Sequence, residues 1–325
     1  MTQSKLLPSL RNALTNILFF SITLLVGLGA AELVLRVKNS DQKNYNIEMW
    51  RYSKLLKVLS ANPNLGHEHR PGKSAKLEGV EIRINSLGMR GPEPDLSDSA
   101  KKKILFLGSS NTLGWGVPEE ETMTSVLQKD LGENTLVMNA GIGNYNAVRY
   151  VTLFKNKLRS LHPDIVVVHY FVRDAEALPP GRNNFILRNS EVAAMVYHMI
   201  QQSLNKSKGL EGLVDFYRSM YRAETPGYQA MTRALGELGE MSKQDGFRVV
   251  LAMTPEIHQM NPYPFGFIHE MMRGIADGFA WTYVDLYEPM SAVPAQDLWA
   301  MPGDPHLNAK GHRLMAEALL PYLES

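Results

Sequence analysis

The sequence predicts a doubly wound α/β sandwich, in which helices cover both faces of a parallel sheet, preceded by one N-terminal transmembrane helix. Two observations predict the sandwich: nearly continuous apolar runs typical of strands buried on both faces, and amphipathic stretches that separate these runs. A third observation, a long uncharged stretch near the N-terminus, predicts the membrane helix. With 325 residues and 44% hydrophobic content, the chain is long enough to bury a large core.

The N-terminal apolar stretch runs from Asn12 to Ala31 and contains no charged residue. At about 1.5 Å of rise per residue, a helix of this length spans the roughly 30 Å hydrocarbon core of a bilayer. Two alternatives stay open: a buried core helix, and a cleaved signal peptide with Gly29 and Ala31 as the small residues before the cut. The apolar run continues to Leu35, which favours an uncleaved anchor. Basic residues flank both ends, so they do not decide the orientation.

The predicted organisation has three parts. A membrane anchor covers residues 1–38, a juxtamembrane lead-in covers 39–100, and an α/β domain covers 101–325. The lead-in is polar and contains four prolines. Its most structured part is the segment GVEIRINSLGMRG at 79–91, which has the character of a strand and a turn.

Five apolar runs in the α/β domain predict the strands of the sheet. They cover residues 103–108, 135–141, 164–171, 247–255 and 281–287. The stretches between and after them have the spacing of amphipathic helices, at 119–131, 146–160, 227–245, 265–279 and 309–323. Because strand and helix alternate, the strands are expected to be parallel and joined by crossover helices.

One insert, at about residues 178–226, interrupts the alternation between the third and fourth strands. It contains EVAAMVYHMIQQSL, in which apolar residues recur three and four positions apart. The insert is either an elongated crossover or a lid over the carboxyl edge of the sheet, the edge at which open α/β folds bind ligands. Asn183 and Asn184 would reach that edge from a lid.

The composition excludes several kinds of site. A formal net charge of +1 provides no field that recruits nucleic acid, so we expect no nucleic-acid partner. The absence of cysteine excludes disulfides, thiolate metal ligands and a cysteine nucleophile. The sequence has no set of residues with metal-ligand spacing and no Walker or GxGxxG loop, so we expect neither a metal nor another cofactor.

The loop GSSNTLGWGV, residues 108–117, follows the first predicted strand and is therefore expected at the ligand-binding edge. Glycine before the two serines permits a sharp turn from strand to helix, where a serine meets the positive end of the helix and nearby N–H donors. A serine in such a loop is either a nucleophile or part of an ordinary glycine-rich turn. This stretch alone does not choose between Ser109 and Ser110.

A candidate base lies near the C-terminus, in the segment GDPHLNAKGH at 303–312. An imidazole such as that of His306 takes the proton of a serine and returns it to a leaving group, and a carboxylate such as that of Asp304 fixes the tautomer of the imidazole. Taken singly, Asp304 is a residue of a helix N-terminal turn and His306 is a surface histidine. Together with the serine loop, they indicate a Ser-His-Asp arrangement.

Three segments, in this order, resemble sequence blocks of the SGNH/GDSL hydrolase superfamily. GSSNTLGWGV matches the family's block I, GDSxTxGxGV, which makes Ser110 the nucleophile by position and puts Ser109 in place of the usual aspartate. NAGIGNYN resembles block II, whose glycine donates a backbone N–H to the oxyanion; that glycine falls on Asn144, one residue after Gly143. DPHLNAKGH resembles block V and places the base at His306.

The resemblance covers about residues 101–325, and INSLGMRGPE in the lead-in resembles membrane-anchored bacterial members of the family. It implies a flavodoxin-like three-layer sandwich with a parallel sheet, the SGNH hydrolase fold. Two features depart from the family pattern. Block III usually supplies an asparagine amide to the oxyanion, but this chain has FVRD with Arg173 there, and the usual DxxH is shortened to DxH, which puts Gly303 where that aspartate would fall.

Arg173 has three interpretations. A guanidinium donates charge-assisted hydrogen bonds, so it would hold an oxyanion or a sugar hydroxyl more strongly than an amide does. Alternatively, it fills the pocket, or it forms a local ion pair with Asp174 at the end of a strand. Losing one oxyanion donor typically costs about 10² to 10³ in rate, so an uncompensated change predicts a slow enzyme.

The resemblance implies a serine esterase that acts on acyl esters, chiefly O-acetyl esters, of carbohydrate or lipid at the cell envelope. Its partners would be that substrate and, through the N-terminal helix, a membrane, with the catalytic domain on the exported side. The implied oxyanion donors are Ser110, Gly143 or Asn144, and Arg173. The alternatives are an acyltransferase and a non-catalytic glycan-binding or assembly protein on a degenerate SGNH scaffold in exopolysaccharide production.

Three further side chains have structural interpretations. His169 lies in an apolar run and is expected to be a core histidine. His312 is expected to cap or pack the last helix. Trp115 either lines a substrate pocket or anchors the serine loop from below.

Overall fold

The structure, a computed structural model, describes residues 6–40, 42, 44–181, 184–204, 209–302 and 304–324, without the side chains of 6–10, 202, 204, 304 and 305. These residues belong to two units. The first unit comprises Met1–Trp50 and Asn184–Lys206, and the second comprises Arg51–Asn183 and Ser207–Ser325.

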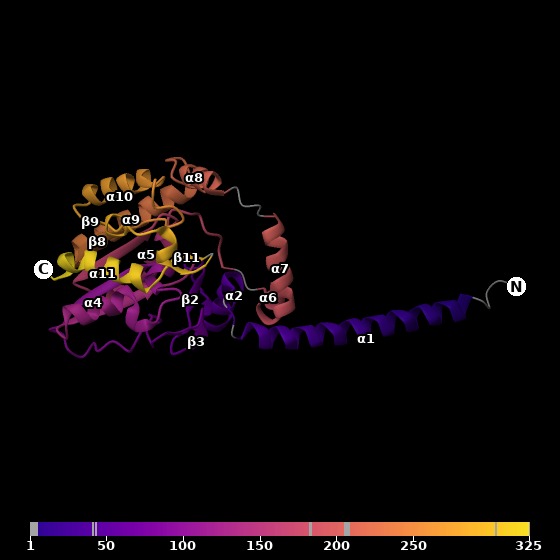
Figure 1. Cartoon of the computed structure of the whole chain (residues 1–325). Helices are drawn as coiled ribbons and strands as arrows, with labels where there is room; N and C mark the ends of the chain where they lie inside the picture. The colour runs from indigo at the N-terminus through magenta and orange to yellow at the C-terminus, as the bar shows by residue number, and fades with distance from the viewer. Residues whose placement is uncertain are drawn as a thin grey trace. The chain divides into compact units, whose positions relative to one another are not determined.

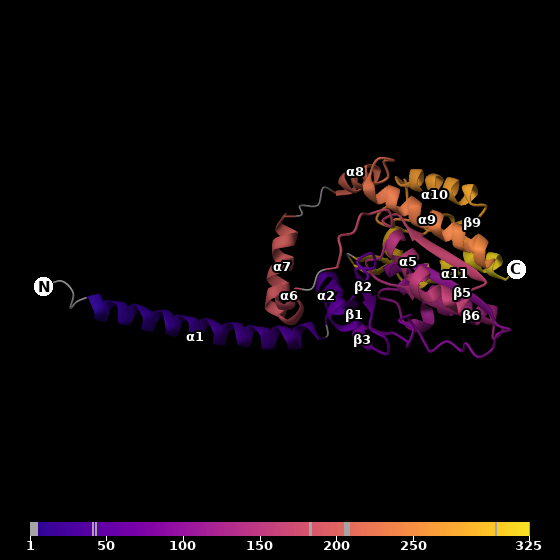
Figure 2. The same ribbon diagram turned by 180° about the vertical axis from the view of Figure 1, so that it is seen from behind.

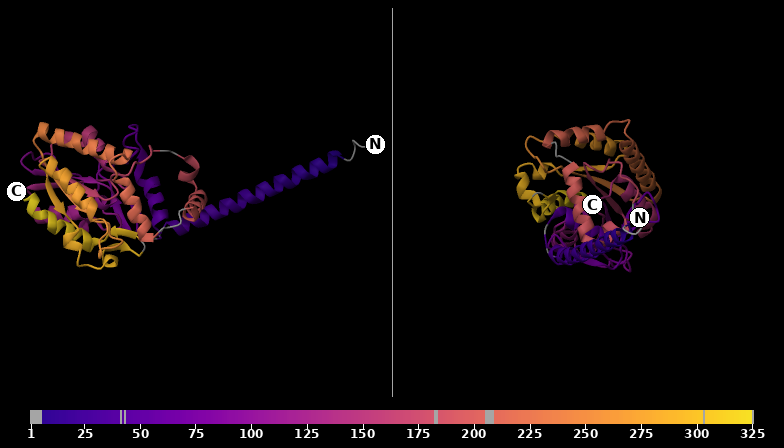
Figure 3. Two further views of the ribbon diagram at one scale, coloured as in Figure 1. Left: turned by 90° about the horizontal axis from the view of Figure 1, so that it is seen from above. Right: turned by 90° about the vertical axis from the view of Figure 1, so that its right-hand side faces the viewer.

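The first unit contains the N-terminal helix and two helices of the insert. α1 (Leu6–Asn39) is one long continuous helix (Figures 1 and 3). Its segment Arg11–Asn39 is long and apolar enough to cross a membrane, since its most apolar 18-residue window has a mean hydropathy of 2.2, and by length and composition it also fits a signal sequence. The insert adds α6 (Phe185–Asn189) and α7 (Glu191–Leu204).

Hydrogen bonds join α1 to the start of α7 within this unit. The Glu32 carboxylate accepts the backbone N–H groups of Glu191 and Val192 at 3.0 and 3.1 Å, and therefore caps α7. The Asn39 amide donates to the Glu191 carboxylate at 2.9 Å. The insert segment is thus held by the end of α1 that follows the apolar run.

The second unit contains the predicted parallel sheet. Its strands are β5 (Lys102–Gly108), β6 (Thr135–Gly141), β7 (Ile165–Phe171), β8 (Arg248–Thr254) and β9 (Thr282–Asp285). They pair in the order β6-β5-β7-β8-β9, and every pairing is parallel. This is the flavodoxin-like order, in which the chain reverses direction beside the first strand and ligands bind at the carboxyl edge. The predicted fold class is confirmed.

Helices cover both faces of the sheet. Alternate strand residues point to opposite sides, and each side packs against its own set of helices. Leu105 and Leu107 pack with α5 (Ala147–Leu153), α9 (Pro226–Asp245) and α10 (Gly266–Gly278), whereas Ile104 and Phe106 pack with α4 (Met123–Leu131) and α11 (Ala309–Leu323). Figures 1 and 2 show these layers from opposite sides. All four strand residues are fully buried, as expected for a sheet covered twice.

The lead-in forms a helix and two hairpins. α2 (Tyr45–Leu56) leads into β1 (Lys57–Leu59), which pairs with β2 (His67–His69), and β3 (Ser74–Leu77) pairs with β4 (Val80–Arg83). From Arg51 onward, the lead-in belongs to the same unit as the sheet. The backbone N–H of Arg90 donates to the Asn139 carbonyl on β6 at 3.0 Å, so the lead-in extends the edge of the sheet.

The second unit also contains the last helix of the insert, a short helix after β5 and a hairpin before α11. α8 (Gly209–Met220), the last helix of the insert, buries Tyr217 and Met220 in the core under α9 and α10. α3 (Ser110–Leu113) follows β5 directly. β10 (Trp299–Met301) and β11 (Asp304–Leu307) form an antiparallel hairpin immediately before α11.

Candidate active site

The structure brings Ser110 and His306 together. Ser110 is the first residue of α3, and His306 lies on β11. The distance between Ser110 Oγ and His306 Nε2 is 2.8 Å, although 196 positions separate the two residues. Both residues are partly exposed. A serine hydroxyl at this distance can pass its proton directly to an imidazole nitrogen.

Glycines give the serine loop its sharp turn. A Cβ at Gly108 would overlap Thr112 Oγ1 and lie 2.8 Å from the carbonyl oxygen of His169, so only glycine fits between β5 and α3. Gly114 ends α3 with φ of 79°, in the left-handed region that favours glycine. The turn that presents Ser110 therefore depends on both glycines.

His169 fixes the floor of this loop and has no free ring nitrogen. Its Nδ1 bonds Thr112 Oγ1 at 2.9 Å, and its Nε2 bonds Thr254 Oγ1 at 2.6 Å. Burial lowers the pKa of His169 to about 3, so the ring is neutral. The expected core histidine is confirmed.

Trp115 and His312 also have structural roles. The Trp115 ring is buried, with its centroid 5.4 Å from that of Tyr52 and 6.5 Å from that of His306, which agrees with an anchor under the loop. His312 is buried on α11, and its Nδ1 accepts the N–H of Met123 at 3.0 Å. It therefore packs the last helix, as the sequence predicted, and it also caps α4.

Arg90, from the lead-in motif, clamps the other end of the serine loop. Its Nη1 donates to the carbonyl oxygens of Leu113 and Gly114 at 2.7 and 2.6 Å, and its Nη2 donates to that of Val117 at 2.6 Å. The side chain is 4% exposed, and burial lowers the pKa of Arg90 to about 10, which leaves it charged. The carbonyls at the end of α3 and just after it are thus bound by a buried cation.

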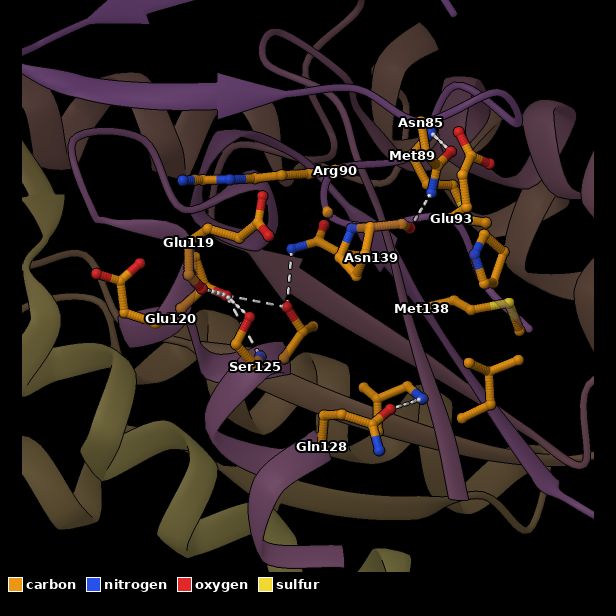
Figure 4. Close-up of a pocket in the computed structure, with 17 residues that line it drawn as sticks. Asn85, Met89, Arg90, Glu93, Glu119, Glu120, Ser125, Gln128, Met138 and Asn139 are labelled. Carbon is orange, nitrogen blue, oxygen red and sulfur yellow. Dashed lines mark hydrogen bonds between the residues drawn. The ribbon is translucent and has the colours of Figure 1, made fainter. Parts of the chain in front are cut away.

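A cavity of about 260 Å³ lies beside this clamp, between the lead-in turn and β6 (Figure 4). Figure 4 shows Arg90, Glu119 and Asn139 around it, with the Asn139 amide directed toward α4. That amide donates to Thr124 Oγ1 of α4 at 3.0 Å and to the carbonyl oxygen of Thr112 at 2.7 Å. Ser110 and His306 do not line this cavity. We therefore assign the cavity to the residues that support the serine loop and not to the catalytic pair.

The block II loop is held by side chains of the lead-in. The N–H of Gly143 donates to the Tyr52 hydroxyl at 3.0 Å, and the carbonyl oxygen of Gly143 accepts from Lys57 Nζ at 2.8 Å and from His67 Nε2 at 3.0 Å. A Cβ at Gly143 would lie 2.7 Å from Tyr52 Cε1, so glycine is required there. Asn144 follows with φ of 63°.

His69 sets the direction of this hydrogen-bond chain. Its Nδ1 lies 2.9 Å from the Gly88 carbonyl oxygen, which can only accept, so Nδ1 carries the proton. Burial lowers the pKa of His69 to about 3, so Nε2 is unprotonated and accepts the Tyr52 O–H at 2.6 Å. The Tyr52 oxygen is then the acceptor for Gly143 N–H. Gly143 N–H is therefore occupied in this structure.

The block III position has a different arrangement from the family pattern. Arg173 Nε and Nη2 donate to the Glu176 carboxylate at 2.5 and 3.3 Å. Asp174 is buried instead, where its carboxylate accepts the Phe171 N–H at 3.1 Å and burial raises its pKa. The ion pair at this strand end is thus formed with Glu176 and not with Asp174.

Some predicted residues lie outside the described part of the chain. The side chain of Asp304 is one of them, although its backbone begins β11. Asn183 is another, whereas Asn184 is described and caps α6 by accepting the Leu187 N–H at 3.1 Å. Among the described residues, no group of three His, Cys, Asp or Glu side chains could hold a metal ion.

Sequence reasoning missed Tyr52, Lys57 and Arg90 as parts of the site. Only Arg90 lies in a segment that the sequence singled out, the INSLGMRGPE motif. Tyr52 and Lys57 lie in a polar stretch with no recognisable motif, so no pattern linked them to block II.

A flavodoxin-like parallel sheet with a serine on the first strand-to-helix loop defines the class: the protein has the SGNH hydrolase fold. Residues 106–314 match the GDSL-like lipase/acylhydrolase family, and the chain belongs to this family. The α/β domain is thus an acylhydrolase domain, as predicted. No curated protein matches the sequence.

Solved structures that are similar to this chain share little sequence with it, as three examples illustrate. A member of the lipolytic protein G-D-S-L family from Veillonella parvula DSM 2008 has 14% identity and a TM-score of 0.42, covering 68% of this chain and 97% of its own. The lipase/acylhydrolase from Enterococcus faecalis has 15% identity and a TM-score of 0.42, covering 69% and 95%. The acetyl xylan esterase AlAXEase has 20% identity and a TM-score of 0.42, covering 68% and 98%.

Proposed function

We propose that the protein is a serine esterase that cleaves acyl esters, chiefly O-acetyl esters, of carbohydrate or lipid at the cell envelope. The observation that carries the proposal is the 2.8 Å distance between Ser110 Oγ and His306 Nε2, in a domain of the acylhydrolase family. The family supports an acyl ester as substrate, and the N-terminal helix supports the location.

In the proposed first step, Ser110 Oγ attacks the ester carbonyl while its proton passes to His306 Nε2. The tetrahedral intermediate collapses when the C–O bond to the alcohol breaks, and His306 returns the proton to that leaving oxygen. Water then attacks the acyl-serine with His306 again as base, which releases the acid and restores Ser110. We assign to Asp304 the role of orienting His306.

We assign the oxyanion donors to the N–H groups of Ser110 and Asn144. Of the two block II candidates, Gly143 already donates to Tyr52, which supports Asn144. Arg173 remains the candidate for the third donor, and this role requires its guanidinium to leave Glu176 when substrate binds. Donors that are fixed before reaction stabilise the oxyanion without reorganisation.

We propose that α1 anchors the protein in a membrane, with the domain on the exported side. The 29-residue segment Arg11–Asn39 supports this, since none of its most apolar window is buried by the rest of the chain. An anchored protein of full length should stay in the membrane fraction after a carbonate wash. Release of a shortened chain would instead show a cleaved signal sequence.

The experiment for the esterase compares p-nitrophenyl acetate hydrolysis by the full chain in detergent with that of two variants. Ser110→Ala should lose at least about 10³ of kcat, because nucleophile and base act as one unit. Ser109→Ala is the matched control and should keep most of the activity. Equal rates for Ser110→Ala and the parent chain would overturn the assignment.

A second candidate, a non-catalytic glycan-binding or assembly protein, is favoured by one observation: the Arg173–Glu176 pair where the family has an amide donor. It predicts binding of an acylated glycan without turnover. An acyltransferase would share the acyl-serine but pass the acyl group to a sugar hydroxyl. Mass analysis of products from an O-acetylated oligosaccharide, with and without an acceptor sugar, separates the three outcomes.

A further inference from the structure

We propose that Lys57, at the start of β1, is a positioning residue of the oxyanion hole. Its ammonium group holds and polarises the peptide between Gly143 and Asn144, whose N–H is the donor assigned to the oxyanion. This role depends on the proposed function, and it brings into the site a residue of the lead-in, outside every sequence block of the family.

The geometry centres on one peptide unit, because the carbonyl oxygen of Gly143 and the N–H of Asn144 belong to the same amide. Lys57 Nζ donates to this oxygen at 2.8 Å, and His67 Nε2 donates to it at 3.0 Å. The nitrogen lone pair of a peptide is delocalised toward the carbonyl, so a cation on the oxygen draws electron density from the nitrogen. The N–H of Asn144 thereby becomes a stronger donor, in the manner of charge-assisted hydrogen bonds.

Side chains bind this peptide and both of the neighbouring peptides, and so fix its orientation. Asn144 has φ of 63°, in the left-handed region that costs energy for a residue with a Cβ. Arg149 Nη1 donates to the carbonyl oxygen of Asn144 at 2.9 Å, and Tyr52 accepts the N–H of Gly143. The peptide groups before, at and after the proposed donor are thus each held by a side chain, and the central one is held by Lys57.

Lys57 is 6% exposed, and its Nζ lies 4.2 Å from the centroid of the Tyr52 ring. The titratable groups around it are Tyr52 of α2, His67 and His69 of β2, and Arg149 of α5. Beyond these groups, the charge of Arg90 acts on Tyr52 and His69, and the Tyr145 ring contacts that of His67. Burial, with a smaller contribution from the charge of Arg149, lowers the pKa of Lys57 to about 7. Burial also lowers the pKa of His67 to about 2, which keeps that ring neutral.

These values give the proposed role a pH dependence. Below its pKa, Lys57 is charged and polarises the peptide. As the pH rises through about 7, the charge and the polarisation are lost. The parent enzyme should therefore lose kcat on the alkaline side, and a variant without the titrating group should not show this fall.

The test uses the full chain in detergent, with p-nitrophenyl acetate as substrate and phenylboronic acid as a tetrahedral mimic of the intermediate. Lys57→Met keeps the length of the side chain and removes its charge, while His67 still bonds the carbonyl. Lys57→Arg keeps a charge that does not titrate near neutral pH. Lys155→Met, which removes an exposed lysine paired with Glu237, is the matched control.

For Lys57→Met we expect kcat to fall about 10-fold, less than the 10² to 10³ of a lost donor, because Lys57 acts through the peptide. KM should stay within about 2-fold, and the affinity for phenylboronic acid should fall in parallel with kcat. Lys57→Arg should retain more of kcat than Lys57→Met and lack the alkaline fall, and Lys155→Met should match the parent.

Two results would overturn the proposal. One is an unchanged kcat and pH profile in Lys57→Met while Ser110→Ala is inactive. The other is a loss of kcat in Lys57→Met without any loss of affinity for phenylboronic acid, which would indicate a purely structural effect. Full activity in Ser110→Ala would instead overturn the proposed function, so the two failures are distinguishable.

Discussion

The hydroxyl of Tyr52 accepts the backbone N–H of Gly143 at 3.0 Å, across 91 positions of the chain. Tyr52 therefore fixes a loop of the acylhydrolase domain, although it lies in the segment before that domain. The same hydroxyl bonds His69 Nε2 at 2.6 Å, so one side chain satisfies two buried groups of different segments.

Tyr52→Phe should destabilise the protein without removing any apolar contact. It leaves Gly143 N–H and His69 Nε2 buried without a partner, which costs about 1–3 kcal/mol for each group. Thermal unfolding of the full chain in detergent should show a lower Tm. Tyr322→Phe, which changes an exposed tyrosine on α11, is the control and should leave the Tm unchanged; equal Tm values for both variants would contradict the chain of hydrogen bonds.

Arg90→Lys should lower kcat while the protein remains folded. Arg90 donates from two nitrogens to the carbonyls of Leu113, Gly114 and Val117, and a lysine has only one nitrogen. The loop that carries Ser110 should therefore be less well positioned in the variant. Displacement of a reacting group by about 1 Å can cost roughly 10² in rate.

The rate of Ser110 acylation by p-nitrophenyl acetate in a stopped-flow burst is the direct readout for Arg90→Lys. Arg83→Lys is the control, because Arg83 forms an exposed ion pair with Glu119. Normal acylation in Arg90→Lys would show that the clamp does not position the serine.

Gly108→Ala and Gly274→Ala should have opposite effects on stability. A Cβ at Gly108 meets Thr112 and the backbone of His169, so the variant must distort the turn between β5 and α3 and should fold poorly. A Cβ at Gly274, inside α10, meets nothing within 4 Å, and alanine there should stabilise the protein by about 0.4–1 kcal/mol. Equal Tm values for these two variants would contradict the close approach at Gly108.

Lys57→Met should raise the free energy of unfolding near pH 7. The pKa of Lys57 is lowered in the folded state from 10.5 to about 7, so between these values the unfolded chain binds more protons and stability rises with pH. At or below pH 7 the folded protein bears the full cost of a buried charge, and replacing such charges with apolar groups of similar size often stabilises by about 1–4 kcal/mol. Urea titrations should show a gain for Lys57→Met at pH 7 that shrinks toward pH 10; a gain independent of pH would contradict the lowered pKa.

The sheet was predictable because its strands lie in nearly continuous apolar runs. The run at 103–108 became β5 and that at 164–171 became β7, with bounds that differ by one residue at one end. Burial on both faces imposes this pattern, so the sequence must display it. The short strands of the lead-in lack such a pattern, since each is only partly buried.

The site was predictable only where a motif linked residue type to position. Ser110 and His306 could be paired because their loops match two blocks, and the structure brings their side chains together. Lys57 could not be predicted, because a lysine in a polar stretch is usually exposed and nothing local indicates its burial. The sequence also did not predict that Arg173 pairs with Glu176. The partners considered from the sequence were an oxyanion, a sugar hydroxyl and Asp174.

The most direct measurement is covalent labelling of the full chain with a fluorophosphonate, followed by intact-mass and peptide analysis. The Ser110–His306 pair predicts one adduct per chain, located on Ser110, present in Ser109→Ala and absent from both Ser110→Ala and His306→Ala. No adduct on the parent chain, or an adduct that persists in Ser110→Ala, would contradict a nucleophilic Ser110.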